Sequence, residues 1–344
     1  MRVLPATLAA GTGLAAYSLA EPYWLKLTER SLVTGHQGPT VTILHLSDSH
    51  LTRSDKRLKS WIGRLPEKLG EVPDLILGTG DFIDNDSGID PVLDALASLD
   101  ARLGKFYVLG SHDYFQAQFH VSSFKKYFTG DHTATKAPSA DIDRLEHGLQ
   151  SQGWVPLTNR SEVLDTEFGT IRLTGVDDPY LKRHKTGHIS RSAQDVLAIG
   201  LVHAPDVVSE YLLAGFDLVI GGHTHAGQVR VPFYGALVTN CNLPTALAGG
   251  LHRVGEGWLH VSPGLGQGRF TPIRFDCRPE ATLLRLEPAA PGERRQVPAR
   301  PLVSAYGKWR SLAARCVRDA EVAGSNPAFP TPKAQVTGPE DMIT

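Results

Sequence analysis

Cysteine is scarce in this sequence. The chain of 344 residues has three cysteines, at Cys241, Cys277 and Cys316, and no two of them form a CxxC pair. An odd number of widely spaced cysteines argues against a disulfide framework and against a cysteine-ligated zinc site. Any metal chemistry must therefore depend on other side chains, and the 14 histidines offer a rich supply.

The sequence also lacks an excess of charge of either sign. It has 35 lysines and arginines against 36 aspartates and glutamates, a formal net charge of −1. A general nucleic-acid binder usually shows a basic excess, so we expect no nucleic-acid partner. With 41% hydrophobic and 21% charged residues and no internal repeat, the composition is that of a globular protein with an ample core.

Long uncharged runs are equally rare, and the clearest one is residues 3–20. We expect residues 1–32 to form a hydrophobic anchor and linker that hold the protein at a membrane through this single segment. A signal peptide and a plain N-terminal helix packed on the domain are the alternatives, because the run barely reaches the ~20 residues that span a bilayer. The flanking charges fix no orientation, so the side of the membrane stays open.

The C-terminal region, residues 289–344, lacks hydrophobic periodicity, and we expect it to be a disordered tail. Its segment Gly324-Ser325-Asn326-Pro327 is what the T-arm of a transfer-RNA gene encodes when read in frame. We hypothesise that the reading frame runs past its usual stop into such a gene. The predicted folded domain is then residues 33–288.

Five apolar runs within this domain predict buried strands. Each is followed at once by side chains that bind metals or move protons. In order, the polar stretches are Asp48-x-His50, Gly80-Asp81, Gly110-Ser111-His112-Asp113, His203 and Gly222-His223-Thr224-His225. Carboxyl ends of strands gather at one edge in layered α/β folds, so these stretches are expected to meet.

The last of these stretches is the most informative. His223 and His225 are two residues apart, so they cannot share a helix face, but in a loop after a strand both rings can turn to one point. The glycines before them let the backbone come close to whatever lies there. Imidazole is a ligand for zinc, iron and other transition ions.

The remaining patterns complete an α/β reading. Helices are expected over residues 55–70, broken at Pro66, over 90–103 with Asp90 as N-cap, and over 206–214. Further strands are expected at 163–164, 170–176, 228–234, 258–261 and 282–286. Aromatic residues between Phe115 and Phe128 indicate a helix that either packs in the core or forms a lid, with Lys125 and Lys126 facing an anionic substrate. Other polar residues in or after these runs are given structural roles: Asp84 as a cap, Asp177 and Asp178 in a turn, and His45 and His260 hydrogen-bonded in the interior.

The five ordered stretches resemble the motifs of the calcineurin-like metallophosphoesterases, D-x-H, G-D, G-N-H-D/E, H and G-H-x-H. The resemblance covers residues 40–286 and implies a four-layer αββα sandwich. The run Pro232-Phe-Tyr-Gly-Ala-Leu-Val-Thr-Asn-Cys241 is similar to an actinobacterial-type, membrane-associated branch.

The resemblance implies a centre of two divalent ions, with manganese, iron or zinc suited to mixed carboxylate and imidazole ligands. It gives one ion to Asp48, His50 and His225, and the other to Ser111, His203 and His223, with Asp81 bridging. It further implies that a metal-bridging hydroxide attacks the phosphorus, that His112 assists the leaving oxygen, and that Asp113 orients His112. No pattern identifies substrate-binding residues.

One position departs from the family pattern, because Ser111 stands where asparagine is usual. Serine is shorter and a weaker neutral ligand. The predicted function is a phosphodiesterase or pyrophosphatase, and its expected substrate is a lipid-linked or cell-envelope phosphoester. The alternatives are a non-catalytic or weakened metal-binding regulatory domain, a mononuclear enzyme and, disfavoured by the neutral charge, a nuclease.

Overall fold

The computed structural model describes residues 3–116, 139–268 and 270–289. The C-terminal tail from residue 290, with its read-through hypothesis, lies outside the described residues. So do most of the expected aromatic helix and its lysines, Lys125 and Lys126. The described part has two six-stranded sheets.

The first sheet holds three of the five predicted strands that precede polar stretches. Its order is β1 (Lys26–Val33), β14 (Glu280–Glu287), β2 (Val41–Leu46), β3 (Leu75–Gly78), β4 (Gly104–Tyr107) and β5 (Trp154–Pro156). Strands β2 to β5 are parallel, and only the β14–β2 pair is antiparallel. The carboxyl ends of β2, β3 and β4 therefore share one edge.

The second sheet holds the other two. Its order is β12 (Gly250–Val254), β13 (Gly257–Val261), β9 (Leu218–Gly221), β8 (Asp195–Leu201), β7 (Gly169–Gly175) and β6 (Arg160–Thr166). Strands β7, β8, β9 and β13 are parallel, with antiparallel hairpins at both edges.

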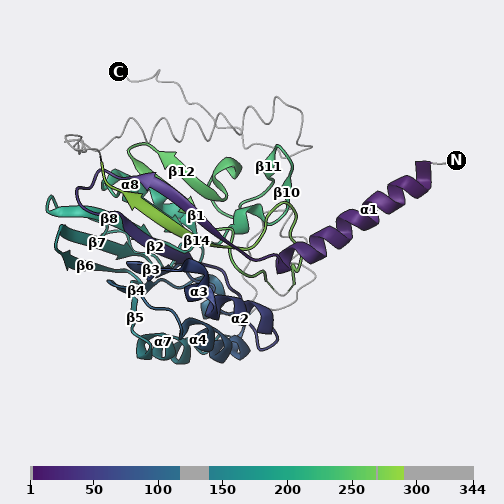
Figure 1. Cartoon of the computed structure of the whole chain (residues 1–344), viewed down its shortest axis with the longest axis horizontal. Helices are drawn as coiled ribbons and strands as arrows, with labels where there is room; N and C mark the ends of the chain where they lie inside the picture. Colours follow the sequence, from purple (N-terminus) through teal and green to yellow (C-terminus); the bar gives the residue numbers. More distant parts are fainter. Residues whose placement is uncertain (1–2, 117–138, 269, 290–344) are drawn as a thin grey trace, which may run out of the picture. The chain divides into compact units, whose positions relative to one another are not determined.

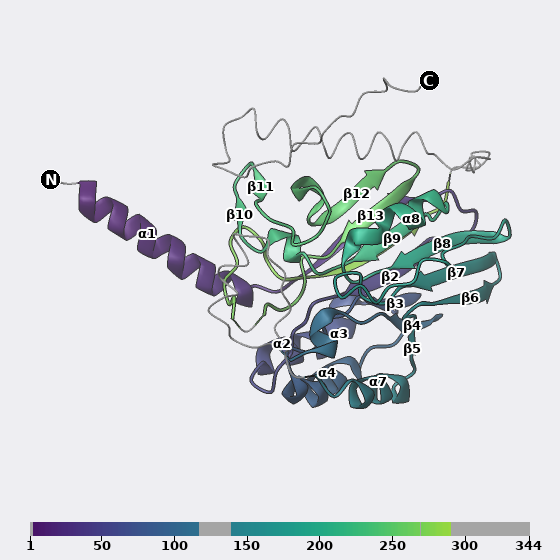
Figure 2. The ribbon, with the colours of Figure 1, turned by 180° about the vertical axis from the view of Figure 1, so that it is seen from behind.

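The sheets stack face to face, and helices cover the outside (Figure 1). Alternate residues of β2 show the layering: Ile43 packs with apolar residues of the second sheet, whereas Leu44 packs toward the helices. The helices on the first sheet are α2 (Lys56–Gly63), α3 (Leu65–Leu69), α4 (Ile89–Leu96) and α7 (Ile142–Ser151). The short helix α8 (Val208–Leu213) lies on the second sheet, as the reverse view shows (Figure 2).

Helix α8 packs closely because β8 carries a glycine beneath it. The buried Tyr211 hydroxyl donates to the carbonyls of Thr174 and Leu201, and a Cβ at Gly200 would lie 2.5 Å from the Tyr211 ring. The expected four-layer αββα sandwich is thus confirmed, with a thin fourth layer.

Some predicted elements differ in extent. The helix expected over residues 90–103 is α4, which begins at Ile89 and ends at Leu96, so Asp90 lies in its first turn and Gly88 is the N-cap. The chain must then turn toward β4, through Gly104 at φ 142°. The strand expected over 228–234 shrinks to β10 (Arg230–Val231), because Gln228 and Phe233 have left-handed backbones.

The expected membrane anchor is not supported. Residues 3–20 do form a helix, α1 (Val3–Ala20). Nevertheless, no helix in the described part of the chain is both long and apolar enough to cross a membrane. Eighteen residues rise about 27 Å, and Pro5, two glycines and several hydroxyl groups dilute the apolar character.

Residues 26–32, expected to belong to the linker, instead form most of strand β1, which pairs with β14. Their lysine, glutamate and arginine face solvent at the edge of the sheet, which hides the strand from a hydrophobic pattern. The remaining domain limits stay predictions.

Candidate metal centre

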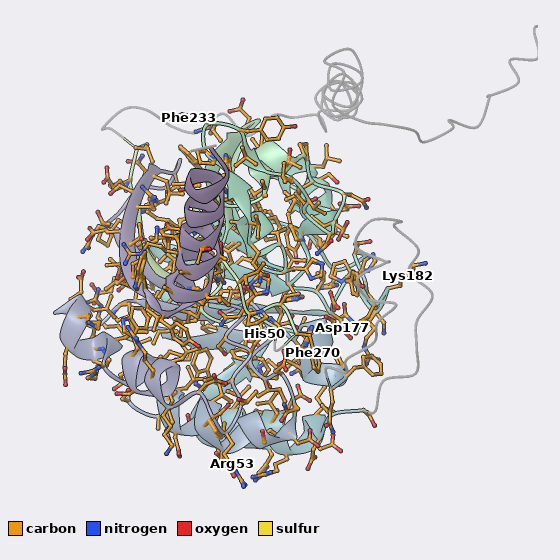
Figure 3. The ribbon with its side chains drawn as sticks, turned by 90° about the vertical axis from the view of Figure 1, so that its right-hand side faces the viewer. His50, Arg53, Asp177, Lys182, Phe233 and Phe270 are labelled. Atoms are coloured by element: carbon orange, nitrogen blue, oxygen red, sulfur yellow. The ribbon has the colours of Figure 1, made fainter. Side chains whose placement is uncertain are left out.

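All five predicted stretches follow the carboxyl ends of their strands and meet where the two sheets face each other. Asp81, after β3, is the centre of this meeting point. Its Oδ2 lies 3.5 Å from Nε2 of His50, after β2, and 3.3 Å from Nε2 of His203, after β8. Its Oδ1 accepts a hydrogen bond from the backbone N–H of His112, after β4. Figure 3 shows His50 toward the middle of this face.

The backbone at these positions is unusual. Five of the predicted metal-binding residues have φ between +43° and +66°, a region that non-glycine residues seldom adopt: Asp48, His50, Asp81, His223 and His225. Each such residue costs on the order of 1–3 kcal/mol, and such strain tends to cluster at functional sites. The left-handed turns bend each side chain back toward the common centre.

Two glycines allow the close packing around these turns. A Cβ at Gly110 would lie 2.3 Å from Asp81 Oδ1 and 2.7 Å from the His203 ring. A Cβ at Gly222 would lie 2.0 Å from the Ser47 hydroxyl and 2.2 Å from Asp48 Oδ2. Both positions therefore exclude any larger residue.

The converging side chains form three overlapping groups. Within each group, the ligand atoms lie within 4.8 Å of one another. In the first group, His225 Nε2 is 3.2 Å from His50 Nε2 and 3.5 Å from Asp48 Oδ1. The groups are Asp48 with His50 and His225, Asp48 with Asp81 and His203, and His50 with Asp81 and His112.

Behind two of the rings, an oxygen lies near the nitrogen that faces away from the centre: a hydrogen-bonded carbonyl behind His203 and a nearby carboxylate behind His50. His203 Nδ1 lies 2.7 Å from the carbonyl of Thr79, which leaves Nε2 facing Asp81. His50 Nδ1 lies 3.6 Å from a carboxylate oxygen of Asp84, which leaves Nε2 facing Asp81 and His225. Metal-binding histidines commonly carry such a carbonyl or carboxylate behind the ring.

The electrostatics are those of a buried cluster. Burial raises the pKa of Asp48, and the nearby Asp81 adds to this. Asp81 behaves differently: burial acts to raise its pKa, but His203, His112 and His50 together hold that pKa well below its usual range. His203 has a raised pKa because Asp81 and Asp48 outweigh its burial. The His203 and Asp81 side chains therefore favour each other's charged forms.

His225 differs from the other rings, because an arginine lies behind it. The fully buried Arg274 places Nη2 3.3 Å from His225 Nδ1 and donates to the carbonyls of Pro263 and Gly266. Burial, together with the positive charges of His50 and Arg274, holds the pKa of His225 well below its usual range. His225 is therefore neutral at physiological pH, as a ligand must be. The sequence pattern gave no signal for Arg274.

His223 and Ser111 are less closely involved. The His223 ring lies 5.2 Å from the His203 ring and 5.0 Å from the Tyr180 ring, and its Nε2 is 3.2 Å from the carbonyl of Asn240. Burial and the charge on His203 lower the pKa of His223 to about 4. His223 belongs to none of the three groups found among the described residues. Ser111 is half-buried and opens the one-turn helix α5 (Ser111–Tyr114).

The expected pairing of His112 with Asp113 differs from the structure. Asp113 is fully buried and accepts hydrogen bonds from the backbone N–H groups of Phe82 and Gly110, so it braces the loops. The carboxylate beside the His112 ring is Asp84, whose Oδ1 lies 3.4 Å from His112 Nδ1. Asp84 was expected only to cap a turn.

Asp178, like Asp84, is a carboxylate whose position differs from its expected role, which was a residue of a turn. It is fully buried, and burial raises its pKa to about 6, although the positive charge of His203 acts in the opposite direction. It follows β7 and lies in the same loop as Tyr180, which contacts His223. Only its strand-end position could have indicated a role.

A hollow of about 660 Å³ is lined by residues of this loop and of α5, although none of the predicted metal-binding residues lines it. Tyr114 and Asp177 line it, and the Tyr114 hydroxyl donates to Asp177. Arg183 stacks on the Tyr114 ring and pairs with Asp177, and Arg160 lines the same hollow. In Figure 3, Asp177 lies to one side of His50.

Comparisons with known proteins agree with this arrangement. The model of the calcineurin-like phosphoesterase family matches residues 41–227. The chain is 28% identical over 290 residues to YkuE of Bacillus subtilis, an uncharacterized metallophosphoesterase, covering 81% of this chain and 92% of YkuE. It is 27% identical over 289 residues to the phosphodiesterase YaeI of Escherichia coli, covering 83% and 97% of the two chains.

A third relative adds a different activity. The UDP-2,3-diacylglucosamine pyrophosphatase LpxG of Chlamydia trachomatis is 27% identical over 278 residues, covering 71% of this chain and 82% of LpxG. These comparisons do not address the actinobacterial-type branch, which stays a prediction.

Proposed function

Because the chain belongs to the calcineurin-like phosphoesterase family, we propose that it is a dinuclear, metal-dependent hydrolase of phosphodiester or pyrophosphate bonds. The observation that carries this proposal is the meeting of five strand ends around Asp81, where two carboxylates and four imidazole rings form three overlapping groups of three, each with its ligand atoms within 4.8 Å of one another. Such mixed ligands suit manganese, iron or zinc better than magnesium or calcium.

The residues fit a pair of cations. Asp48, His50 and His225 would hold the first and His203, His223 and Ser111 the second, with Asp81 between them. The buried Nε2 of His203 has no hydrogen-bond partner among the described residues, as expected of an atom reserved for a ligand. When bound, the cations would supply Lewis acidity: they neutralise charge on the phosphoryl group and make water nucleophilic near neutral pH.

His112 is the residue placed to give a proton to the leaving oxygen. Its ring is about one-third exposed, so a substrate can reach it, and its Nδ1 faces Asp84. Although burial alone would lower it, Asp81 and Asp84 raise the pKa of His112 to about 9. The ring is thus protonated near neutral pH, as a general acid must be.

The hollow lined by Tyr114 and Asp177 is the proposed place for the part of the substrate that leaves. The guanidinium groups of Arg160 and Arg183 suit a phosphate or another anionic group, and the Tyr114 ring gives a flat apolar surface. We expect Arg183→Gln to raise KM with little change in kcat.

The test is a phosphoester panel joined to metal analysis of the full-length protein. The protein is stripped with chelator, reloaded with Mn²⁺, Zn²⁺ or Fe²⁺, and assayed on nitrophenyl phosphodiesters, nitrophenyl monoesters, a pyrophosphate and duplex DNA. We expect two ions per chain and turnover of the diester or pyrophosphate. A chain that binds ions but hydrolyses nothing would support the regulatory alternative instead.

A weakened second site is the alternative that the structure specifically favours. Ser111 lacks the amide of asparagine, and His223 Nε2 is already near the Asn240 carbonyl, so only Nδ1 of His223 remains for a cation. If one ion per chain binds tightly and activity persists, the enzyme is mononuclear.

We further infer that the substrate is lipid-linked. Exposed apolar side chains lie on two segments, one after His225 with Val231, Phe233, Tyr234 and Leu237, and one before Arg274 with Phe270 and Ile273. Gln228 ties the segments together by donating to the carbonyls of Thr271 and Ile273. LpxG, whose name denotes a diacylglucosamine substrate, is matched over 82% of its length.

Replacing Phe233 and Tyr234 by serine tests this inference. We expect slower hydrolysis of a diacyl pyrophosphate presented in detergent micelles and unchanged hydrolysis of a water-soluble nitrophenyl diester. Equal loss on both substrates, or on neither, would contradict a lipid-linked substrate.

A further inference from the structure

A chain of hydrogen bonds runs from the interface between the sheets to one predicted metal ligand. His260, on β13, and His45, on β2, face each other with their Nδ1 atoms 2.9 Å apart. His45 Nε2 lies 2.8 Å from the Thr79 hydroxyl, which donates to the Ser47 hydroxyl at 2.7 Å. Ser47 donates to Asp48 Oδ2 at 2.5 Å. All five residues are at most 3% exposed.

The carboxylate sets the direction of the whole chain. An ionised carboxylate can only accept hydrogen bonds, so the Ser47 hydroxyl donates to Asp48, and the Thr79 hydroxyl donates to Ser47. The Thr79 hydroxyl must then accept from His45, and the proton of His45 is on Nε2. If the Thr79 hydroxyl instead donated to His45, it would have no proton left to donate to Ser47.

The same logic fixes the second ring. Burial keeps the pKa of His45 well below its usual range, so the ring is neutral and its Nδ1 carries no proton. Two bare nitrogens 2.9 Å apart would repel, so His260 must donate from Nδ1. Burial also lowers the pKa of His260 to about 4, which leaves its Nε2 bare, and this atom has no hydrogen-bond partner among the described residues.

At the other end, the chain occupies one oxygen of Asp48 and leaves the other for a cation. Oδ2 receives the Ser47 hydroxyl, whereas Oδ1 lies 3.5 Å from His225 Nε2 in the first ligand group. The backbone N–H of His223 donates to both oxygens and holds the plane of the carboxylate.

We propose that His45 and His260 are positioning residues for the metal centre: through Thr79 and Ser47 they deliver a one-way set of hydrogen bonds that fixes which oxygen Asp48 presents. The proposal rests on the proposed function, because it takes Asp48 to be a metal ligand. Groups behind metal ligands typically change affinity by about 10–100-fold when removed.

The first test needs no metal. Nitrogen-15 NMR of the histidine rings in chelator-treated protein, assigned with His45→Gln and His260→Gln variants, reports which nitrogen holds each proton. We expect His45 protonated at Nε2 and His260 at Nδ1. A His45 ring protonated at Nδ1 would overturn the proposal, because the chain could not then run toward Asp48.

The second test cuts the chain at its middle and keeps both rings. Thr79→Val should weaken binding of the first Mn²⁺ equivalent by about 10–100-fold, whereas Thr79→Ser, which retains the hydroxyl, should restore it. Thr174→Val is the matched control: Thr174 is equally buried, but its hydroxyl bonds Ser161 outside this chain. Its Mn²⁺ affinity should equal that of the unchanged protein.

The outcomes separate the two proposals. If the unchanged protein binds no divalent ion, the proposed function fails and the positioning role falls with it. If it binds Mn²⁺ and Thr79→Val binds equally well, or Thr174→Val weakens binding as much as Thr79→Val, only the positioning role is overturned.

Discussion

Asp84 lies directly beside the His112 ring: Oδ1 of the carboxylate is 3.4 Å from Nδ1 of the ring. The same oxygen is 3.6 Å from Nδ1 of His50, so one buried carboxylate supports two rings with different proposed tasks. His50 faces the cation position, whereas His112 is partly open to solvent. In the proposed mechanism, this single buried group couples the orientation of a metal ligand to proton donation by His112.

Removing the charge of Asp84 should expose this coupling. In Asp84→Asn, the pKa of His112 should fall from about 9, because Asp84 is one of three carboxylates, with Asp81 and Asp113, that raise it. We expect kcat on an alkyl phosphodiester to fall about 10²-fold, while a nitrophenyl diester, whose leaving group needs no proton, loses much less. The pH profile of kcat checks this, with the exposed Asp94→Asn as control. Equal losses on both substrates would argue against His112 as the acid.

Close packing at Gly222 predicts a sharp loss of metal binding. A Cβ there would overlap Ser47 Oγ and Asp48 Oδ2, so Gly222→Ala must displace the carboxylate. We expect Mn²⁺ affinity to fall by two orders of magnitude or more, consistent with about 3 kcal/mol of lost binding. Gly187→Ala, where a Cβ meets nothing within 4 Å, should bind normally. Isothermal titration calorimetry on both variants measures this directly.

The buried histidine pair predicts a dependence of stability on acid. His260 has a folded pKa of about 4 because burial disfavours its charged form, with Glu280 opposing and Arg30 and His252 adding to the shift. Its unfolded pKa is about 6.5, so the unfolded chain binds the extra proton. The stability that His260 contributes is therefore complete above pH 6.5 and is lost as the pH falls toward 4.

Urea unfolding of the metal-free protein between pH 7 and 4 tests this. In His260→Gln, the free energy of unfolding should fall less steeply with acid, by up to about 1.4 kcal/mol per pH unit. The exposed His147→Gln should retain the full slope. Identical slopes in all three proteins would mean that His260 is not neutral in the folded state.

A substitution at position 111 is expected to increase the affinity for the second cation. Ser111→Asn places a longer amide oxygen at the start of α5, and we expect the second cation to bind at least about tenfold more tightly, the equivalent of 1.4 kcal/mol. Metal stoichiometry at limiting Mn²⁺ measures this, and affinity for the first cation should not change. An unchanged second affinity would show that residue 111 does not contact the ion.

Much of this site could be predicted because parallel strands deliver their following residues to one edge. The strands before Asp48 and Asp81 are wholly buried, and the strand before His203 is buried except at Val196, so their patterns are continuous and easy to recognise. The family model covers the same stretch of chain. The spacing of ligands after strands is local information, and the sequence contains it.

What could not be predicted depends on contacts between distant segments. The sequence suggests only a capping role for Asp84, because the two rings beside it, His50 and His112, come from other loops. Arg274 lies in an irregular segment, and only the folded chain shows that it is buried behind His225. Strand β1 was hidden because an edge strand carries charge on its open face. The pairing of His112 failed for the same reason: adjacency in sequence favoured Asp113, but geometry selects Asp84.

The most direct measurement is Mn²⁺-dependent hydrolysis of bis-nitrophenyl phosphate by the unchanged protein and by Asp81→Asn, each with its metal content determined. Asp81 is the residue on which both proposed cation positions depend. We expect the unchanged protein to turn over with two ions per chain, and Asp81→Asn to lose both activity and at least one ion. Full activity in Asp81→Asn would contradict a metal centre built around that carboxylate.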